Sequence, residues 1–280
     1  MTISPRRALV PALRHLILGL GVVFALLPMV WIGVASLQPP DRLYQYPPSW
    51  IPETLFLDNF ERVLTTQLPA QMLNSTIIAG ATSAIVVVTG SLAAYAFARF
   101  RFAFRDALFL TILATQMIPA LTKIVPLYLM MQGLGGINTR WSLVLVYVGV
   151  SLPFAVWMLS GFFEGLPRDL EEASYIDGAG RVGTFFRIAL PLALPGLAAV
   201  AILTFVQAWN EFVIALVLIS LPELKTYQLG LFDFLSNATF DRSVVGLLNA
   251  GAVLGLVPTA IGYLLVQRYF IAGLTAGAVK

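Results

Sequence analysis

The sequence predicts an all-α, polytopic membrane protein, and two observations carry this prediction. Of the 280 residues, 59% are hydrophobic and only 11% are charged, whereas soluble domains are usually about a quarter charged. The apolar residues form six runs of the length that an α-helix needs to cross the hydrocarbon core of a bilayer. We therefore expect a single transmembrane domain over residues 1–280, with spans at about residues 16–37, 73–98, 107–131, 142–163, 194–219 and 244–266.

Composition also excludes several classes of function. The chain has no cysteine and a single histidine, so we expect neither a disulfide nor a metal site. A membrane enzyme would need a nucleophile with its base, paired metal-binding acids or an H-E-x-x-H motif, and the sequence offers none of these, so we expect no catalytic residues. The net charge of +3 is modest, and we expect the chain to contact membrane lipid and no nucleic acid.

The first apolar run follows Arg6, Arg7 and Arg14. A cleaved signal peptide is the alternative for such a segment, but its apolar region would be shorter and no convincing A-x-A cleavage site follows, so we predict a span. Residues 39–69 are polar and rich in proline and aromatic residues. We expect them to form an ordered external loop with a short helix at about residues 59–64.

Proline interrupts the third run. Pro119 and Pro126 lie within it, and a proline inside a helix bends the helix and frees a carbonyl group that needs a partner within the protein. The third span should therefore line something other than lipid. Pro153 suggests a kink in the fourth run as well. In the sixth run, the four-residue spacing of Gly251 and Gly255 predicts a close approach of helices.

Polar side chains within the spans are candidates for a solute path. The fifth span carries Gln207, Asn210 and Glu211 in an otherwise aliphatic helix. Because a carboxylate in lipid is costly, such groups usually face the bundle interior or a cavity. Two interpretations stay open: these side chains hydrogen-bond a solute, or they fix helix packing near the outer gate. The full set of substrate-path candidates is Gln116, Gln207, Asn210, Glu211 and Asn249.

The basic residues predict the orientation of the spans. An even number of spans places both termini on one side, and cytoplasmic loops carry an excess of Lys and Arg. With cytoplasmic termini, eleven basic residues lie inside, five lie outside and Lys123 lies within a span. We therefore expect both termini, and the loop at about residues 164–193, in the cytoplasm.

The loop at residues 164–193 is the one place where charge is concentrated between two long apolar runs. Asp169 and Glu172 predict an Asp variant of the capping box at the start of a short helix, and Gly178 predicts its end. A second short helix should follow. Both helices carry an apolar stripe, formed by Leu170, Ala173, Ile176, Val182, Phe185, Phe186 and Ala189. A helix pair of this kind suits a groove on another protein.

The spacing within this loop resembles a known motif. Glu172-Ala173-Ser174, three residues, Gly178, nine residues and Ile188-Ala189-Leu190-Pro191 are similar to the EAA loop of permease subunits of binding-protein-dependent ABC importers, with Ser174 replacing the second alanine. The resemblance implies a MetI-like permease fold and a loop that couples to an ATPase. The coupling residues that it implies are Glu172, Ala173, Ser174, Asp177, Gly178, Ile188, Leu190 and Pro191.

Further residues resemble the carbohydrate-type permeases related to MalG of the maltose importer. They are Ala94-Tyr95-Ala96, Pro119, Pro126, Ile176-Asp177-Gly178-Ala179, Trp209-Asn210-Glu211-Phe212 and the tail at residues 273–280. The resemblance implies a multi-pass protein of the cytoplasmic (inner) membrane that works with a second, MalF-like permease, a dimer of ATPase subunits and an extracytoplasmic solute-binding protein, on a saccharide substrate. It also implies that the tail reaches the ATPase interface through Gly273, Thr275, Gly277 and Lys280.

Uphill import needs an energy source that this sequence does not encode. It contains no G-x-x-x-x-G-K-[ST] phosphate loop, so we expect no cofactor in this chain, and ATP and Mg to be bound by the partner ATPase subunit. A secondary transporter is a less favoured alternative, because it would usually show intramembrane titratable relays and an inverted repeat. A non-sugar solute such as glycerol phosphate or a polyol also stays open as a substrate.

Overall fold

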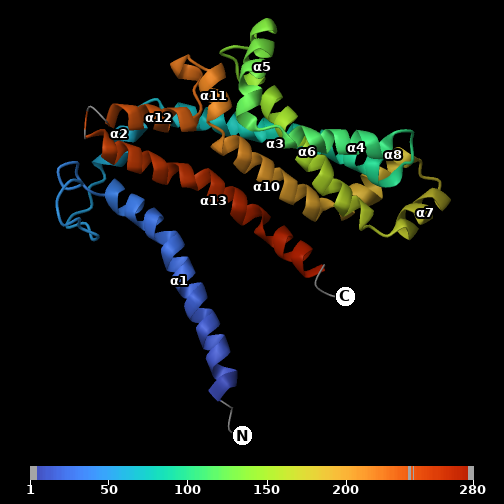
Figure 1. Ribbon diagram of the computed structural model, residues 1–280, viewed down its shortest axis with the longest axis horizontal. Coiled ribbons are helices and arrows are strands. Elements are labelled where there is room, and N and C mark those ends of the chain that lie inside the picture. Colours follow the sequence, from blue (N-terminus) through green and yellow to red (C-terminus); the bar gives the residue numbers. More distant parts are fainter. Residues whose placement is uncertain (1–4, 239–240, 242, 277–280) are drawn as a thin grey trace. The chain divides into compact units, whose positions relative to one another are not determined.

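The computed structural model describes residues 5–238, 241 and 243–276. Every regular element in this part of the chain is a helix, as the apolar runs predict. The chain divides into two compact units, one formed by residues up to 68 with 231–256, the other by 69–230 with the residues from 257 onward. The long helix α13 (Val244–Ala276) contributes to both units, and so does α12 (Tyr227–Ala238) (Figure 1).

The first unit contains α1 (Pro5–Ser36) and α2 (Asp58–Leu64), and α2 confirms the short helix predicted in the external loop. Asn59 is fully buried and donates from Nδ2 to the carbonyl oxygens of Ser36 and Gln38, at 3.0 and 2.9 Å. This amide therefore fixes the loop against the end of α1. A Cβ atom at Gly251 would lie 2.9 Å from side-chain atoms of Leu231 and Leu68, which confirms the predicted close approach.

Within the described part of the chain, four helices are long and apolar enough to cross a membrane: Leu13–Ser36, Leu68–Arg99, Arg140–Glu164 and Val244–Leu264. Two bent helix pairs raise the number of spans to six if each pair is one span. In the first pair, Arg105–Met117 and Ala120–Gly133 meet at 100°. The bend lies at Ile118 and Pro119, which have extended backbone, so the predicted effect of Pro119 on the third span is confirmed.

The fifth span differs from its prediction. Helix α10 (Leu194–Asn210) ends at Asn210, Glu211 has an extended conformation with ψ 129°, and a separate helix α11 (Val213–Leu218) follows. The prediction of one continuous aliphatic helix through Glu211 is therefore wrong. The bent pair at this place in the chain joins Arg181–Leu192 to Leu194–Asn210 at 74°, so its helical stretch begins inside the loop predicted at 164–193.

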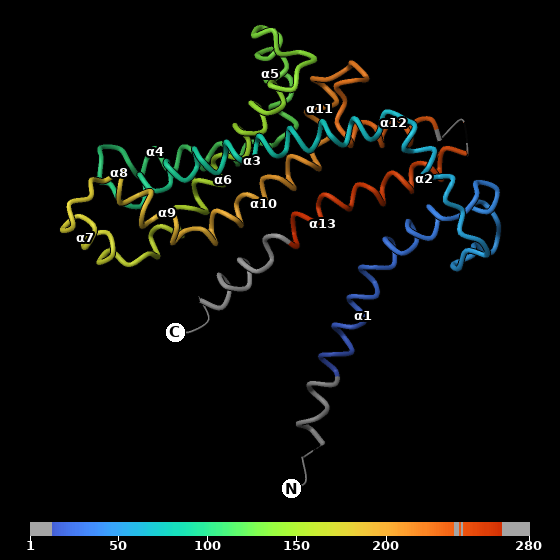
Figure 2. The backbone as a smooth tube through the Cα atoms, turned by 180° about the vertical axis from the view of Figure 1, so that it is seen from behind, coloured from blue at the N-terminus to red at the C-terminus, as the bar shows by residue number. Residues whose placement is uncertain are grey.

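The core of the second unit lies where α3 (Leu68–Arg99), α6 (Arg140–Glu164) and α10 run alongside one another (Figure 2). Helices α3 and α6 contribute small, aliphatic and aromatic residues to it, α10 contributes Leu197 and Val200, and the segment that precedes α10 contributes one phenylalanine and two alanines. The buried residues are Val86, Ala94, Tyr95, Phe97, Ala98, Ala155, Val156, Leu159, Phe163, Phe185, Ala189, Ala193, Leu197 and Val200. The core thus continues from the spans into the loop at 164–193.

Candidate functional site: the coupling loop

The loop between α6 and α10, which we call the coupling loop after its predicted role, folds into four short helical pieces. They are α7 (Arg168–Ile176), α8 (Arg181–Thr184), a π-helical turn η2 (Phe185–Ala189) and α9 (Leu190–Leu192). Helices α7 and α8 contact each other (Figure 1). The predicted pair of short helices is therefore present.

Helix α7 begins differently from the prediction. Its N-cap is Pro167, which has φ −57° and ψ 128° and makes no side-chain cap hydrogen bond. Asp169 lies in the first turn, so the predicted capping box with Glu172 is wrong. Pro167 holds the φ angle of the residue before the helix, and a carboxylate in the first turn interacts favourably with the positive end of the helix dipole without serving as a cap.

The end of α7 follows the prediction closely. Gly178 has φ +83°, the left-handed conformation that favours glycine. The Gly178 N–H donates to the Tyr175 carbonyl at 3.1 Å, and the Ala179 N–H donates to the Ser174 carbonyl at 3.0 Å. These two hydrogen bonds form a Schellman motif, which ends the helix and turns the chain toward α8.

A groove of about 670 Å³ opens on the coupling loop. Six of the eight predicted coupling residues line it: Ala173, Ser174, Asp177, Gly178, Ile188 and Pro191. Glu172 is exposed on α7, and Leu190 is half-buried against the core. The structure therefore brings the two ends of the motif, which are ten residues or more apart in sequence, to one surface.

Large apolar side chains are also exposed on the coupling loop, and one of them, Leu170, lines the groove. Ile176 is 87% exposed and Val182 is 71% exposed, and Leu170 and Phe186 are exposed as well. The predicted apolar stripe is thus divided, because Phe185 and Ala189 are buried in the core of the unit. An exposed apolar patch beside a groove is typical of a protein–protein contact.

Ser174 is the one departure from the EAA pattern, and it has a structural role. Its hydroxyl group lies 3.1 Å from the hydroxyl group of Thr184, and both residues are buried. This hydrogen bond joins α7 to the end of α8. A serine at this position therefore holds the helix pair together in a way that alanine does not.

A buried ion pair beneath α7 was not among the predicted site residues. Arg99, the last residue of α3, donates from Nε to Glu171 Oε1 at 2.7 Å. Tyr95 donates to Glu171 Oε2 at 3.1 Å. The only signal in the sequence is the arginine that closes the second apolar run, and nothing in the pattern selects Glu171 over its neighbour Glu172.

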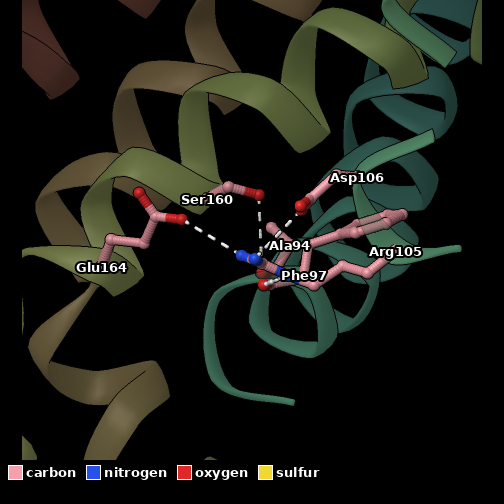
Figure 3. A network of polar contacts seen from close by, with 6 residues as sticks. All are labelled: Ala94, Phe97, Arg105, Asp106, Ser160 and Glu164. Carbon is pink, nitrogen blue, oxygen red and sulfur yellow. Dashed lines mark hydrogen bonds and ion pairs between the residues drawn. The ribbon is translucent and has the colours of Figure 1, made fainter. Parts of the chain in front are cut away.

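A second polar network ties the start of α4 (Arg105–Ala114) to the end of α6 (Figure 3). Arg105 donates from Nε to the Phe97 carbonyl at 2.6 Å and pairs with Glu164 through Nη2 at 3.5 Å. Arg105 also pairs with its neighbour Asp106 at 3.2 Å. This arginine thus connects three elements next to the coupling loop.

Among the substrate-path candidates, Glu211 has its carboxylate fully engaged. Its Oε1 accepts from the Ile214 N–H at 2.7 Å, and its Oε2 accepts from the Tyr147 hydroxyl at 2.7 Å and the Ala215 N–H at 3.1 Å. The carboxylate therefore satisfies free N–H groups at the start of α11 and bridges to α6. We infer that it holds the helix break in place.

Three other candidates, Gln116, Gln207 and Asn210, are more exposed than Glu211. Gln207 and Asn210 are exposed on α10, near the break at Glu211. Asn210 accepts from Gln228 at 3.4 Å, and Gln207 accepts from Ser151 at 3.4 Å. Gln116 is also exposed and donates to the Val150 carbonyl at 2.8 Å.

The remaining predicted residues are Asn249 and those of the C-terminal tail. Asn249 belongs to the first unit, where it donates to the Val245 carbonyl at 2.9 Å. In the tail, the backbone of α13 continues through Gly273 and Thr275, whereas Gly277 and Lys280 lie outside the described residues. The role of the tail therefore stays a prediction.

Replacement of Glu211 should destabilise the second unit. We expect Glu211→Ala to leave the Tyr147 hydroxyl and the two N–H groups without their acceptor, at a cost of about 2–3 kcal/mol. Thermal unfolding of the purified protein in detergent measures the change. Gln207→Ala is the control, since its one bond to Ser151 is long at 3.4 Å. Equal midpoints for both variants would contradict the inferred role of Glu211.

Comparison with known proteins is consistent with this architecture. Residues 86–272 match the family described as "Binding-protein-dependent transport system inner membrane component". The chain is 36% identical over 269 residues to the sulfoquinovosyl glycerol transport system permease protein SmoH of Agrobacterium fabrum, covering 96% of this chain and 93% of that protein. It is also 36% identical over 275 residues to the trehalose/maltose transport system permease protein MalG of Thermococcus litoralis, covering 96% and 98%.

A solved structure resembles the whole chain. It is the crystal structure of a bacterial ABC transporter involved in the import of the acidic polysaccharide alginate, with a TM-score of 0.80 and 25% sequence identity. The match covers 96% of this chain and 99% of that chain. The likeness therefore extends over the spans as well as the coupling loop.

Proposed function

This chain belongs to the family of binding-protein-dependent transport system inner membrane components, and we propose that it works as the transmembrane permease subunit of an ATP-driven sugar importer. The single observation that carries the mechanism is the coupling loop, where a groove and exposed apolar side chains lie on a hydrogen-bonded helix pair. The relatives named above are sugar or glycoside permeases by their names. The chain itself supplies half of the translocation path.

The coupling loop is the proposed binding site for the ATPase subunit. Its residues are Glu172, Ala173, Ser174, Asp177, Gly178, Ile188, Leu190 and Pro191. Ser174, Thr184 and the turn at Gly178 hold α7 and α8 in a fixed relation, so a partner that moves α7 moves the whole loop. Interfaces of this kind transmit rigid-body motion because packed elements do not deform continuously.

The proposed complex has four kinds of protein component. We place a second, MalF-like permease beside this chain, a dimer of ATPase subunits on the coupling loops and an extracytoplasmic solute-binding protein on the outer side. ATP and Mg are bound by the ATPase subunits. The excess of basic residues supports a cytoplasmic location for both termini and the coupling loop, and this is the side on which ATP is available.

The transported solute is proposed to pass the break between α10 and α11. Exposed amides at Gln207 and Asn210 stand next to it in an apolar helix, and such side chains are suited to hydrogen-bond hydroxyl groups. We expect Asn210→Ala to change the apparent KM or the sugar specificity of uptake. Transport assays with several radiolabelled saccharides measure this, and an effect limited to expression level would contradict the proposed contact.

Reconstitution tests the function as a whole. The purified permease pair and ATPase dimer are placed in liposomes, and saccharide-loaded binding protein is added on the outer side. We expect the rate of ATP hydrolysis to rise and labelled saccharide to accumulate. Accumulation driven by a proton or sodium gradient without ATP would instead identify a secondary transporter.

A further inference from the structure

The coupling loop is joined covalently to α6 and α10, yet its buried charged contact is made with a third span, α3. Glu171 on α7 lies at the C-terminal end of α3, where Arg99 and Tyr95 donate to its two carboxylate oxygens at 2.7 and 3.1 Å. The Arg99 and Glu171 side chains are only 6% and 8% exposed. Arg99 also donates from Nη2 to the Leu166 carbonyl at 2.9 Å, just before α7 begins.

Two further contacts join the same end of α3 to the other parts of the coupling loop. The Arg181 guanidinium, at the start of α8, lies 5.2 Å from the ring centroid of Phe100. The ring of Phe185, in η2, lies 4.9 Å from that of Tyr95. The last turns of α3, and Phe100 directly after them, therefore contact α7, α8 and η2, although about 70 to 90 residues separate the partners in sequence.

A buried ion pair resists separation. If α7 moved away from α3, two charges would be left without a partner in a medium of low dielectric constant, which is far more costly than the loss of an exposed pair. The pair is therefore expected to stay closed while the coupling loop moves. Its removal would let the loop shift without carrying α3 along.

We propose that Arg99 and Glu171 are positioning residues that bind the end of α3 to the coupling loop, so that α3 moves with α6 and α10 as one rigid body when the ATPase subunits close. The proposal rests on the proposed function, because it needs an ATPase seated on the coupling loop. It adds that a span without covalent linkage to the loop takes part in the transmitted motion.

The first test separates coupling from folding. Glu171→Gln keeps the volume of the side chain but removes its charge, and we expect the number of saccharide molecules imported per ATP hydrolysed to fall about tenfold, within the usual range of coupling between sites. Glu61→Gln, at an exposed position on α2 and outside the coupling loop, is the matched control for the loss of one charge. An unchanged ratio in properly assembled Glu171→Gln complexes would overturn the proposal.

The second test uses the absence of cysteine from the sequence. Phe100→Cys and Arg181→Cys place two thiols at a contact between α3 and α8 that does not include the buried pair. A short thiol-reactive cross-linker then ties α3 to the loop, in a complex whose partner subunits carry no reactive cysteine. We expect the bridged protein to import within about twofold of the unbridged one, since rigid-body motion leaves the two positions at a constant distance.

The cross-link should also restore import in the variant that lacks the ion pair. In the Glu171→Gln background, we expect the bridge to restore at least half of the lost import per ATP. Arrest of import by the bridge, or no rescue, would show that the loop moves against α3 and would overturn the proposal. A complex of unmodified subunits that shows no ATP-driven import at all would instead refute the proposed function, so the two failures are distinguishable.

Discussion

Charged replacements at Ile176 and Val182 are expected to release the ATPase from the permease. Both side chains are largely exposed on the helix pair of the coupling loop, and burial of such a side chain at an interface stabilises it by about 1.5–3 kcal/mol. A carboxylate at the same place would be buried without a partner, which adds a desolvation cost. The double variant Ile176→Asp, Val182→Asp should therefore bind the ATPase at least about 100-fold more weakly, since every 1.4 kcal/mol is tenfold.

Co-purification of the ATPase with the tagged permease measures this effect. Ile51→Asp is the matched control, because Ile51 is 81% exposed but lies in the loop at residues 39–69. The control should retain the ATPase fully. Normal recovery of the ATPase with the double variant would contradict the placement of the interface on α7 and α8.

Substitution of Gly178 by valine should lower import about tenfold without affecting membrane insertion. The position has φ +83°, and no atom lies within 4 Å of an added Cβ atom, so the penalty comes from the backbone and not from a clash. A left-handed conformation costs an ordinary residue about 1–2 kcal/mol, and a β-branched residue is a genuine outlier there. The Schellman turn would open, and α7 would no longer be held at its angle to α8.

Two controls separate the effect of the left-handed backbone conformation at Gly178 from the effect of replacing a glycine. Gly180→Val changes the same residue type two positions later, where φ is −76° and nothing lies within 4 Å of an added Cβ atom. Gly178→Asn tests the opposite case, since asparagine tolerates the left-handed region. Uptake assays should show both controls near the unmodified rate. An equal loss for Gly180→Val would contradict the role of the turn.

The features that depend on local sequence were predictable. Runs of apolar residues locate the spans, because only a helix satisfies its own backbone in lipid. Pro119 marks the bend in the third span, and Gly178 marks the end of α7 because a positive φ is needed there. The motif from Glu172 to Pro191 also identified the surface on which six of its residues meet.

The features that depend on distant partners were not predictable. The break at Glu211 is stabilised by Tyr147, 64 residues away. Because the aliphatic pattern of the span contains no sign of this distant partner, it predicts one continuous helix. Asp169 has the right spacing for a cap, but Pro167 already sets the start of α7. The pairing of Glu171 with Arg99 joins residues 72 positions apart, and periodicity gives no information about such contacts.

The placement of the coupling loop is tested most directly by the accessibility of a single thiol. Ile176→Cys introduces the only cysteine into the chain, at a position that is 87% exposed. A maleimide that does not cross membranes is added to right-side-out and to inverted vesicles, with and without the ATPase subunits. We expect labelling only in inverted vesicles, and protection from labelling when the ATPase is bound. Labelling in right-side-out vesicles, or equal labelling with and without the ATPase, would show that the ATPase subunits do not bind to this loop.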